Sequence, residues 1–246
     1  MNTGEKADLI TVVTWPVAGS PARLEMLQAM LSSEERGRLD SMADSPRARE
    51  FLVGRAGSRE LLARTCGCKP TDIVFKDGAR GKPSLTFPDM GIAFNLAHSG
   101  GICALAFGQA AAIGIDIEQS HIHFQDVVET ALTPREAAQL ARVPEVRRQD
   151  AFFRTWVAKE AYLKATGDGV SGDFHSLELD LGALPELRPI AIRDSSDGQD
   201  QWSFHSFDAG NSLPGAVAIM TNGRKFTVQI HHEQAADGGA AFTLAL

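Results

Sequence analysis

Two acidic residues stand two positions apart in the otherwise apolar segment Gly114-Ile115-Asp116-Ile117-Glu118. Alternate side chains of a β-strand point to the same face, so Asp116 and Glu118 are expected to project together. Adjacent carboxylates repel each other unless a cation lies between them. An oxygen-only pair suits Mg²⁺ or Mn²⁺, which binds one or two carboxylates together with water and substrate phosphates. A strand end with two solvated acids is the alternative that this motif alone leaves open.

A second charged group lies in Trp156-Val157-Ala158-Lys159-Glu160-Ala161-Tyr162-Leu163-Lys164. Glu160 and Lys164 are four residues apart, so they share one face of a helix in the favourable order. As a functional group, Glu160 would supply a third metal oxygen or a general base, and Lys164 would hold a phosphate. The alternative is a surface ion pair, which contributes only about 0.3–0.5 kcal/mol.

Further side chains that can bind phosphate precede both groups. Gly81-Lys82-Pro83 holds a lysine in a stiff backbone, and we expect its ammonium to be free. In Phe94 to Gly100 (FNLAHSG), His98 ends a short strand, where an imidazole can donate to phosphate oxygens. A lone histidine is more often packed or solvated, and the remaining histidines are interpreted in that way.

Other segments resemble known motifs only in part. Residues 167–172 (GDGVSG) match G-x-G-x-x-G, but they follow a helix and not the strand that dinucleotide binding requires. Cys66-Gly67-Cys68 lacks the second ligand pair of a zinc site. Neither a nucleophile elbow (G-x-S-x-G) nor a P-loop occurs in the sequence.

Hydrophobic periodicity predicts the elements that must position these residues. Helices are expected to begin after the capping residues Ser32, Ser45 and Thr133, and a further helix at 150–165 to end at Gly167. Strands are expected at 9–15, 93–97, 102–107, 113–118, 177–181, 190–192, 202–207, 216–220 and 226–230. The Ala- and Gly-rich segment from Gln234 onward predicts a loosely held tail.

Composition limits the classes of function. The chain has 246 residues, a formal net charge of −7 and 43% hydrophobic residues, which is ordinary for a globular protein and argues against nucleic-acid binding through bulk charge. No apolar run approaches the roughly 17–25 residues of a membrane span, and the first residues lack the pattern of a signal peptide. Three cysteines indicate reduced thiols. We therefore expect a cytoplasmic protein with neither nucleic-acid nor membrane partners.

The charge is unevenly distributed along the chain. Residues 1–111 contain 13 basic and 12 acidic residues, whereas residues 112–246 contain 11 basic and 19 acidic ones. Twelve of the basic residues lie between Arg23 and Lys82. This distribution is consistent with contacts to a polyanion from the first part and a cation site in the second.

Five segments, taken in order, resemble the larger, Sfp-like 4′-phosphopantetheinyl transferases. They are Arg47 to Arg59 (RAREFLVGRAGSR), Gly81-Lys82-Pro83, Phe94 to Gly100, Gly114 to Glu118 (GIDIE) and Trp156 to Lys164 (WVAKEAYLK). The resemblance covers residues from about 47 to 167. It implies an α+β fold in which residues 1–111 and 112–246 form two similar lobes of an intramolecular pseudo-dimer. Coenzyme A would bind in the cleft between the lobes.

The resemblance also implies a reaction. The 4′-phosphopantetheine arm of coenzyme A would pass to a serine hydroxyl of an apo acyl or peptidyl carrier protein, leaving adenosine 3′,5′-bisphosphate. The chain is expected to act as a monomer, because the pseudo-dimer interface is internal. Fatty-acid, polyketide, peptide and siderophore synthesis all use such carriers, and the sequence does not choose among them.

The roles implied by the family fall into three groups. The Mg²⁺ ligands, with Mn²⁺ as the other candidate, would be Asp116, Glu118 and Glu160. Glu160 would also be the base for the carrier serine, directly or through a water, and Lys164 would contact the reacting phosphate. The coenzyme A phosphates would be held by Arg47, Arg55, Lys82 and His98.

Two positions depart from the family pattern. Ala97 stands where many relatives have serine, which removes a hydroxyl contact to the nucleotide. Asp168 stands where lysine is common, which changes the charge near the cleft and bears on carrier preference.

Two other functions remain open. The same carboxylates would suit a metal-dependent phosphohydrolase of a nucleotide diphosphate, which differs from a transferase in its product. A catalytically silent module that binds coenzyme A or a carrier is disfavoured, because all four catalytic side chains are present.

Overall fold

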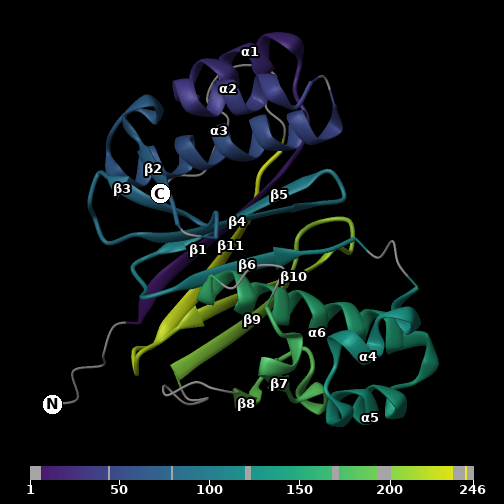
Figure 1. Ribbon diagram of the computed structural model, residues 1–246. Helices are drawn as coiled ribbons and strands as arrows, with labels where there is room; N and C mark the ends of the chain where they lie inside the picture. Colours follow the sequence, from purple (N-terminus) through teal and green to yellow (C-terminus); the bar gives the residue numbers. More distant parts are fainter. Residues whose placement is uncertain are drawn as a thin grey trace, which may run out of the picture.

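The computed structural model describes residues 7–43, 45–78, 80–119, 123–167, 172–192, 201–234 and 242. The fold is a mixture of α-helices and mainly antiparallel sheets, as the sequence predicts. Figure 1 shows the two larger sheets in the middle of the molecule, with α1–α3 at one end and α4–α6 at the other.

The first sheet has the strand order β11-β1-β5-β4. Its strands are β1 (Asp8–Pro16), β4 (Ala93–Ser99), β5 (Ile102–Gly108) and β11 (Phe226–His232). β1, β5 and β4 are antiparallel neighbours, whereas β11 lies parallel to β1. One face is covered by α1 (Pro21–Ala29), α2 (Ser33–Ser41) and α3 (Pro46–Cys66).

The second sheet has the order β6-β10-β9, and all of its neighbours are antiparallel. Its strands are β6 (Ile113–Ile117), β9 (Trp202–Asp208) and β10 (Pro214–Met220). The associated helices are α4 (Val128–Ala131), α5 (Pro134–Arg142) and α6 (Glu145–Thr166), of which α6 packs on the sheet. The two sheets also pack against each other through a core that includes Ile10, Ala104, Ile115 and Val217.

The same order of elements occurs twice along the chain. In each segment, a strand is followed by helices, a small hairpin and two further strands, and the sheet orders β1-β5-β4 and β6-β10-β9 correspond. The hairpins are β2 (Val74–Asp77) with β3 (Pro83–Phe87) and β7 (Leu177–Leu179) with β8 (Pro189–Ile192). Short 3₁₀ helices cover Pro70–Asp72, Phe124–Asp126, Phe174–Ser176 and Leu181–Ala183.

The capping residues set the helix starts. Ser32 Oγ accepts from the Glu35 amide at 3.2 Å, and the Glu35 carboxylate accepts from the Ser32 amide at 2.8 Å, which confirms the predicted capping box. Thr133 forms the same reciprocal box with Glu136 at the start of α5, whereas Ser45 caps α3 through its hydroxyl alone, which accepts from the Ala48 amide at 3.2 Å. The predicted helix 150–165 begins earlier, at Glu145, and so includes the polar residues that precede residue 150.

Two segments after residue 111 belong to the first sheet or its core. β11 pairs with β1, and Phe242 is buried with its ring 5.3 Å from that of Trp15. The predicted loose tail is therefore wrong at Phe242, whose aromatic ring fills the space beneath α3. The proposed division at residue 112 falls between β5 and β6, and these two segments cross it.

α6 crosses β6 at Gly114, where the backbones approach closely. A Cβ added to Gly114 would lie 1.9 Å from the Ala161 carbonyl oxygen and 2.5 Å from the Ala165 nitrogen. Only glycine fits there without moving the helix. The crossing therefore brings the middle of α6 onto the strand that carries Asp116.

Replacing Gly114 with alanine is expected to lower the free energy of unfolding by about 1–3 kcal/mol, because α6 must move away from β6. Urea denaturation measures the change. Gly37→Ala is the control: a Cβ there meets nothing within 4 Å, and in the exposed helix α2 it should raise stability by about 0.5–1 kcal/mol. Equal effects of the two substitutions would contradict the close crossing.

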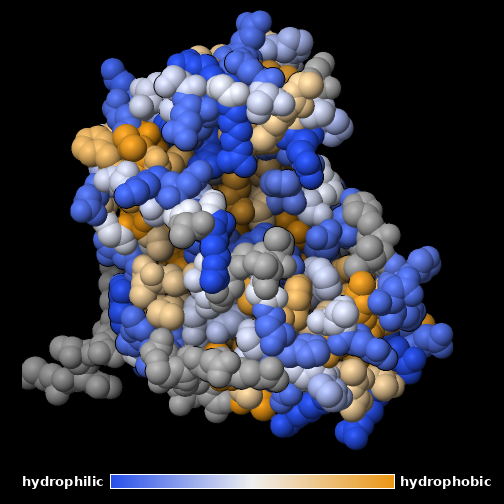
Figure 2. All heavy atoms as spheres, in the orientation of Figure 1, coloured by the Kyte–Doolittle hydropathy of each residue, from blue (hydrophilic) through white to orange (hydrophobic). Residues whose placement is uncertain are grey.

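The surface is mostly hydrophilic over α1–α3, and hydrophobic side chains gather over β2 and β3 (Figure 2). The residues there include Val74 and Phe87, which face each other in the hairpin and are 49% and 55% exposed. Among the described residues, no helix is long and apolar enough to cross a bilayer.

Candidate active site

β6 sorts its side chains onto two faces. Ile113, Ile115 and Ile117 pack in the core between the two sheets. Gly114 and Asp116 therefore face α6, and Glu118 follows them on the same side just after the strand ends. The sequence predicted this alternation.

Asp116 is buried and only partly satisfied. Lys164 Nζ donates to Asp116 Oδ1 at 2.6 Å, while Asp116 Oδ2 is buried without a hydrogen-bond partner. Burial raises the pKa of Asp116, and the Lys164 ammonium opposes this shift. Lys164 thus joins β6 to α6, instead of forming only the helix-surface pair that its spacing allowed.

Glu160 lies one turn before Lys164 on α6. Together with Asp116 and Glu118 it forms three neighbouring carboxylates, called here the acidic group. Burial raises the pKa of Glu160 to about 7, and the charges of Asp116 and Glu118 act in the same direction, whereas Lys164 opposes them. A carboxyl group that titrates near neutral pH can accept a proton from a substrate hydroxyl. The predicted residues Asp116, Glu118, Glu160 and Lys164 are therefore brought together.

The acidic group suits a divalent cation. Among the residues that the structure describes, no three acidic, histidine or cysteine side chains are arranged so that together they could hold a metal ion. Mg²⁺ commonly takes only one or two carboxylates and completes its octahedron with water and substrate phosphates. The unpartnered oxygen of Asp116 and the mutual repulsion of the three carboxylates fit this kind of site.

The end of β4 contacts Glu118 through Ser99, a residue that the sequence analysis did not assign. Ser99 Oγ donates to Glu118 Oε1 at 3.0 Å and accepts from the Gln119 amide at 2.9 Å. Its position next to His98 in the FNLAHSG motif was the available signal. His98 itself is 48% exposed, and its Nδ1 lies 3.5 Å from Glu50 Oε2 on α3.

A cavity of about 590 Å³ lies between α2, α3 and β2. Arg55 lines it with its guanidinium 5.0 Å from the centre of the Phe75 ring and 3.6 Å from Glu35. Arg38, which the sequence analysis did not select, lines it too and stacks 5.0 Å from the Phe51 ring. Arg59 and Lys76 line the cavity as well, and so do Glu34, Glu35 and Asp77, so its walls carry charges of both signs.

Comparison with known proteins adds to this geometry. Residues 112–229 match the 4′-phosphopantetheinyl transferase superfamily. The 4′-phosphopantetheinyl transferase HetI of a Nostoc species is 36% identical over 208 residues, which is 83% of this chain and 84% of that protein. The chain belongs to the 4′-phosphopantetheinyl transferase superfamily. Its activity is the transfer of the phosphopantetheine arm of coenzyme A to a carrier protein.

Two further relatives extend the comparison. The transferase is 30% identical over 255 residues to a phosphopantetheinyl transferase of a Thraustochytrium species, covering 96% of this chain and 81% of that one. It is 29% identical over 196 residues to a 4′-phosphopantetheinyl transferase of Bacillus subtilis, covering 78% and 84%. The segment 112–229 includes the whole acidic group and Lys164.

Lys82 of the transferase differs from the sequence expectation. Its ammonium is not free: it donates to the carbonyl oxygens of Ile113, at 2.9 Å, and Ala165, at 3.0 Å. Desolvation lowers the pKa of Lys82 to about 8. The stiff Gly-Lys-Pro backbone directs the side chain onto the second sheet and α6, which the motif alone does not reveal.

The remaining predicted positions are dispersed. Arg47 is exposed in the first turn of α3 and does not line the cavity. Ala97 is buried in the core between the sheets. Asp168 lies outside the described residues. Thus Arg55 lines the cavity between α2, α3 and β2, and His98 is next to Ser99, which contacts Glu118. The structure does not gather the four proposed phosphate ligands at one place.

Lys159 is a further residue of the transferase that the sequence analysis did not single out. Its ammonium is buried and donates to Glu136 Oε2 at 2.6 Å and to the carbonyls of Ala131 and Phe174 at 3.0 Å. These contacts join α6 to α4, α5 and the segment before β7. They hold the helix turn that presents Glu160.

Proposed function

We propose that the acidic group where β6 meets α6 carries the transfer, with Mg²⁺ bound by Asp116, Glu118 and Glu160. The observation that carries this proposal is the buried, unpartnered oxygen of Asp116 beside two further carboxylates. Mg²⁺, when bound, neutralises charge on the diphosphate of coenzyme A. Mn²⁺ has the same ligand chemistry and is the second candidate.

Glu160 acts as the base in this proposal. The carrier serine hydroxyl attacks the phosphorus that bears the pantetheine arm, a new O–P bond forms, and the bond to adenosine 3′,5′-bisphosphate breaks. The serine proton passes to the Glu160 carboxylate, directly or through a water. Burial and the neighbouring acids give Glu160 a pKa of about 7, which suits a base at neutral pH.

Lys164 contacts the reacting phosphate and stabilises the leaving group. In the structure its ammonium donates a hydrogen bond to Asp116 Oδ1, at the edge of the acidic group. A cation at this position offsets charge that develops on the diphosphate oxygens.

We also propose that residues 1–111 and 112–246 are the two lobes of an intramolecular pseudo-dimer, with β11 and Phe242 of the second segment packed onto the first lobe. The repeated order of elements and the matching sheet orders support it. Coenzyme A would bind between the lobes, with Arg47, Arg55 and His98 as phosphate ligands. The fourth candidate from the sequence, Lys82, instead donates to two backbone carbonyls. Support is strongest for Arg55, which lines the cavity between α2, α3 and β2 together with Arg38.

The cellular setting belongs to the same proposal. Reduced cysteines and a net charge of −7 support a cytoplasmic monomer that acts on apo acyl or peptidyl carrier proteins. Hydrolysis of a nucleotide diphosphate has no support among the relatives described above, all of which are named transferases.

Replacing Asp116 with alanine is expected to weaken coenzyme A binding about tenfold or more in the presence of Mg²⁺, because the cation loses a ligand. Binding without metal should change little. Calorimetry with and without Mg²⁺ measures both. Asp150→Ala is the control, since this exposed carboxylate pairs with Arg154 on the surface of α6. Unchanged binding with Mg²⁺ would contradict the metal assignment.

A further inference from the structure

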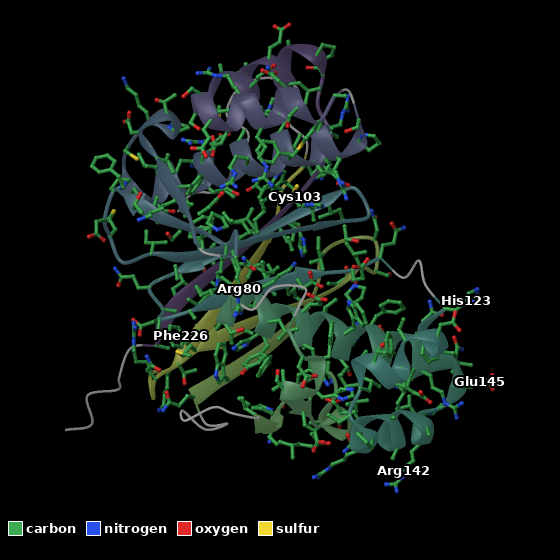
Figure 3. All side chains as sticks on the ribbon, in the orientation of Figure 1. Arg80, Cys103, His123, Arg142, Glu145 and Phe226 are labelled. Carbon is green, nitrogen blue, oxygen red and sulfur yellow. The ribbon has the colours of Figure 1, made fainter. Side chains whose placement is uncertain are left out.

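The loop that carries Lys82 reaches from the β2–β3 hairpin to the elements that bear the catalytic groups. The two carbonyls that accept from Lys82 belong to the first residue of β6 and the last turn of α6. Figure 3 shows Arg80, from the same loop, at the C-terminal end of α6. One ammonium thus joins three separate parts of the chain.

The two carbonyl oxygens that accept from Lys82 explain why a cation suits the C-terminal end of α6. The last carbonyls of a helix have no partner within the helix, and a positive charge there is favourable to the helix dipole. Ala165 is the second-last residue of α6. Lys82 therefore supplies from another lobe the hydrogen bond that the end of α6 lacks.

A second contact holds β6 from the same side. The amide of Ile115 donates to Asn95 Oδ1 at 2.9 Å, and both residues are buried. Asn95 lies on β4, which packs against β6 without pairing with it in one sheet. Lys82 and Asn95 therefore fix the backbone of β6 at residues 113 and 115, immediately before Asp116.

These contacts meet at the closest point between β6 and α6. Gly114 lies between the two fixed residues of β6 and touches the backbone of α6 at Ala161 and Ala165. Lys82 donates hydrogen bonds to both sides of this crossing, to Ile113 on β6 and to Ala165 on α6. Asp116 lies two residues beyond it on the strand, and Glu160 lies one residue before Ala161 on the helix. Their separation therefore depends on how tightly the crossing is held.

We propose that Lys82 is a positioning residue for phosphopantetheine transfer, which sets the distance between the carboxylates of β6 and Glu160, and is not a ligand of the coenzyme A phosphates. Its effect on turnover rests on the function proposed above. Loss of the ammonium displaces the reacting groups relative to one another. The bound nucleotide, held elsewhere, is unaffected.

The test compares Lys82→Met, Lys82→Arg and the wild-type chain in carrier-protein transfer. Lys82→Met is expected to lower kcat about 100-fold, because small displacements of reacting groups have effects of this size, while the KM for coenzyme A changes less than about threefold. Lys82→Arg keeps the donors and should recover at least about tenfold of kcat. Lys69→Met, which removes an exposed lysine, is the charge-matched control.

A higher KM with kcat unchanged would make Lys82 a phosphate ligand and overturn the proposal, and so would no change in either quantity. Hydrogen exchange of the chain without substrate gives an independent measure. Amides of residues 113–117 and of the last turn of α6 should exchange faster in Lys82→Met than in Lys69→Met; equal rates also overturn the proposal. If Lys82→Met does not fold, Lys82→Gln, which retains an N–H donor, replaces it.

The exchange measurement separates the two proposals. A wild-type chain that transfers nothing would contradict the proposed function, while faster exchange in Lys82→Met would still support the link between the lobes. Normal turnover with unchanged exchange in the variant would contradict only the role of Lys82.

Discussion

Replacing Glu160 with glutamine should lower transfer to a carrier protein by about 10²–10⁴-fold, the range expected for loss of a general base. The amide keeps the shape of the side chain but cannot accept the serine proton. Wild-type turnover in this variant would remove Glu160 from the mechanism. Steady-state kinetics with an apo carrier protein measures the effect, and Glu145→Gln, exposed in the first turn of the same helix (Figure 3), is the control.

The same substitution should raise stability above neutral pH. Glu160 has a pKa of about 7 in the folded chain, above the roughly 4.3 of an unperturbed glutamate, so the folded state binds its proton more tightly than the unfolded state. Its contribution to stability is full below about pH 4 and is lost as pH rises through 7. Glu160 is partly exposed, so we expect a discounted gain of about 1–2 kcal/mol for Glu160→Gln at pH 8.

Urea denaturation at pH 5 and pH 8 checks this dependence. The difference between Glu160→Gln and the wild type should be small at pH 5 and largest at pH 8. A gain that is equal at both pH values would show that the wild-type side chain is not destabilised by its ionisation. If the prediction holds, Glu160→Gln lowers transfer activity and raises stability at pH 8, so one carboxylate has opposite effects on the two properties.

Replacing Lys159 with methionine should lower the free energy of unfolding by about 3–5 kcal/mol. The side chain is fully buried, and its removal leaves the buried carboxylate of Glu136 without its cation and two carbonyls without a donor. Glu136 would retain the amide donors of Thr133 and Leu179, which lie at 2.7 and 2.8 Å. Turnover should fall as well, because the turn of α6 that carries Glu160 loses its anchor.

The double variant Lys159→Met/Glu136→Gln separates charge from packing. Its free energy of unfolding should lie between those of Lys159→Met and the wild type, because no uncompensated charge stays buried. Arg154→Met is the control: it breaks the more exposed pair with Asp150 and should cost at most about 1 kcal/mol. Equal losses for Lys159→Met and Arg154→Met in urea denaturation would contradict the importance of burial.

Local patterns predicted the parts of the site that depend on neighbours in sequence. The alternation in GIDIE placed Asp116 and Glu118 on one face, and the four-residue spacing placed Glu160 and Lys164 on another. Capping residues located the starts of the helices at Ser32, Ser45 and Thr133. Each of these features is determined within about one turn of helix or two strand positions, so one sequence is sufficient.

Contacts between distant residues were not predictable in this way. Lys82 finds acceptors 31 and 83 residues away, and both are backbone carbonyls, which every residue possesses. Arg59 was given no role by the sequence analysis, yet it is buried and donates to the carbonyls of Pro70 and Ile73. Phe242 lies in a segment whose composition gave no sign of packing. In each case the partner carries no sequence pattern of its own.

The central claim is that this acidic group transfers phosphopantetheine with a divalent cation. Intact-mass spectrometry of an apo carrier protein, incubated with coenzyme A, Mg²⁺ and the wild-type chain, tests it most directly. The carrier should gain the mass of one phosphopantetheinyl group, and chelation of Mg²⁺ or the substitution Glu160→Gln should prevent the gain. Release of free phosphopantetheine would indicate hydrolysis. No mass gain in acyl and peptidyl carriers of several kinds would contradict the account.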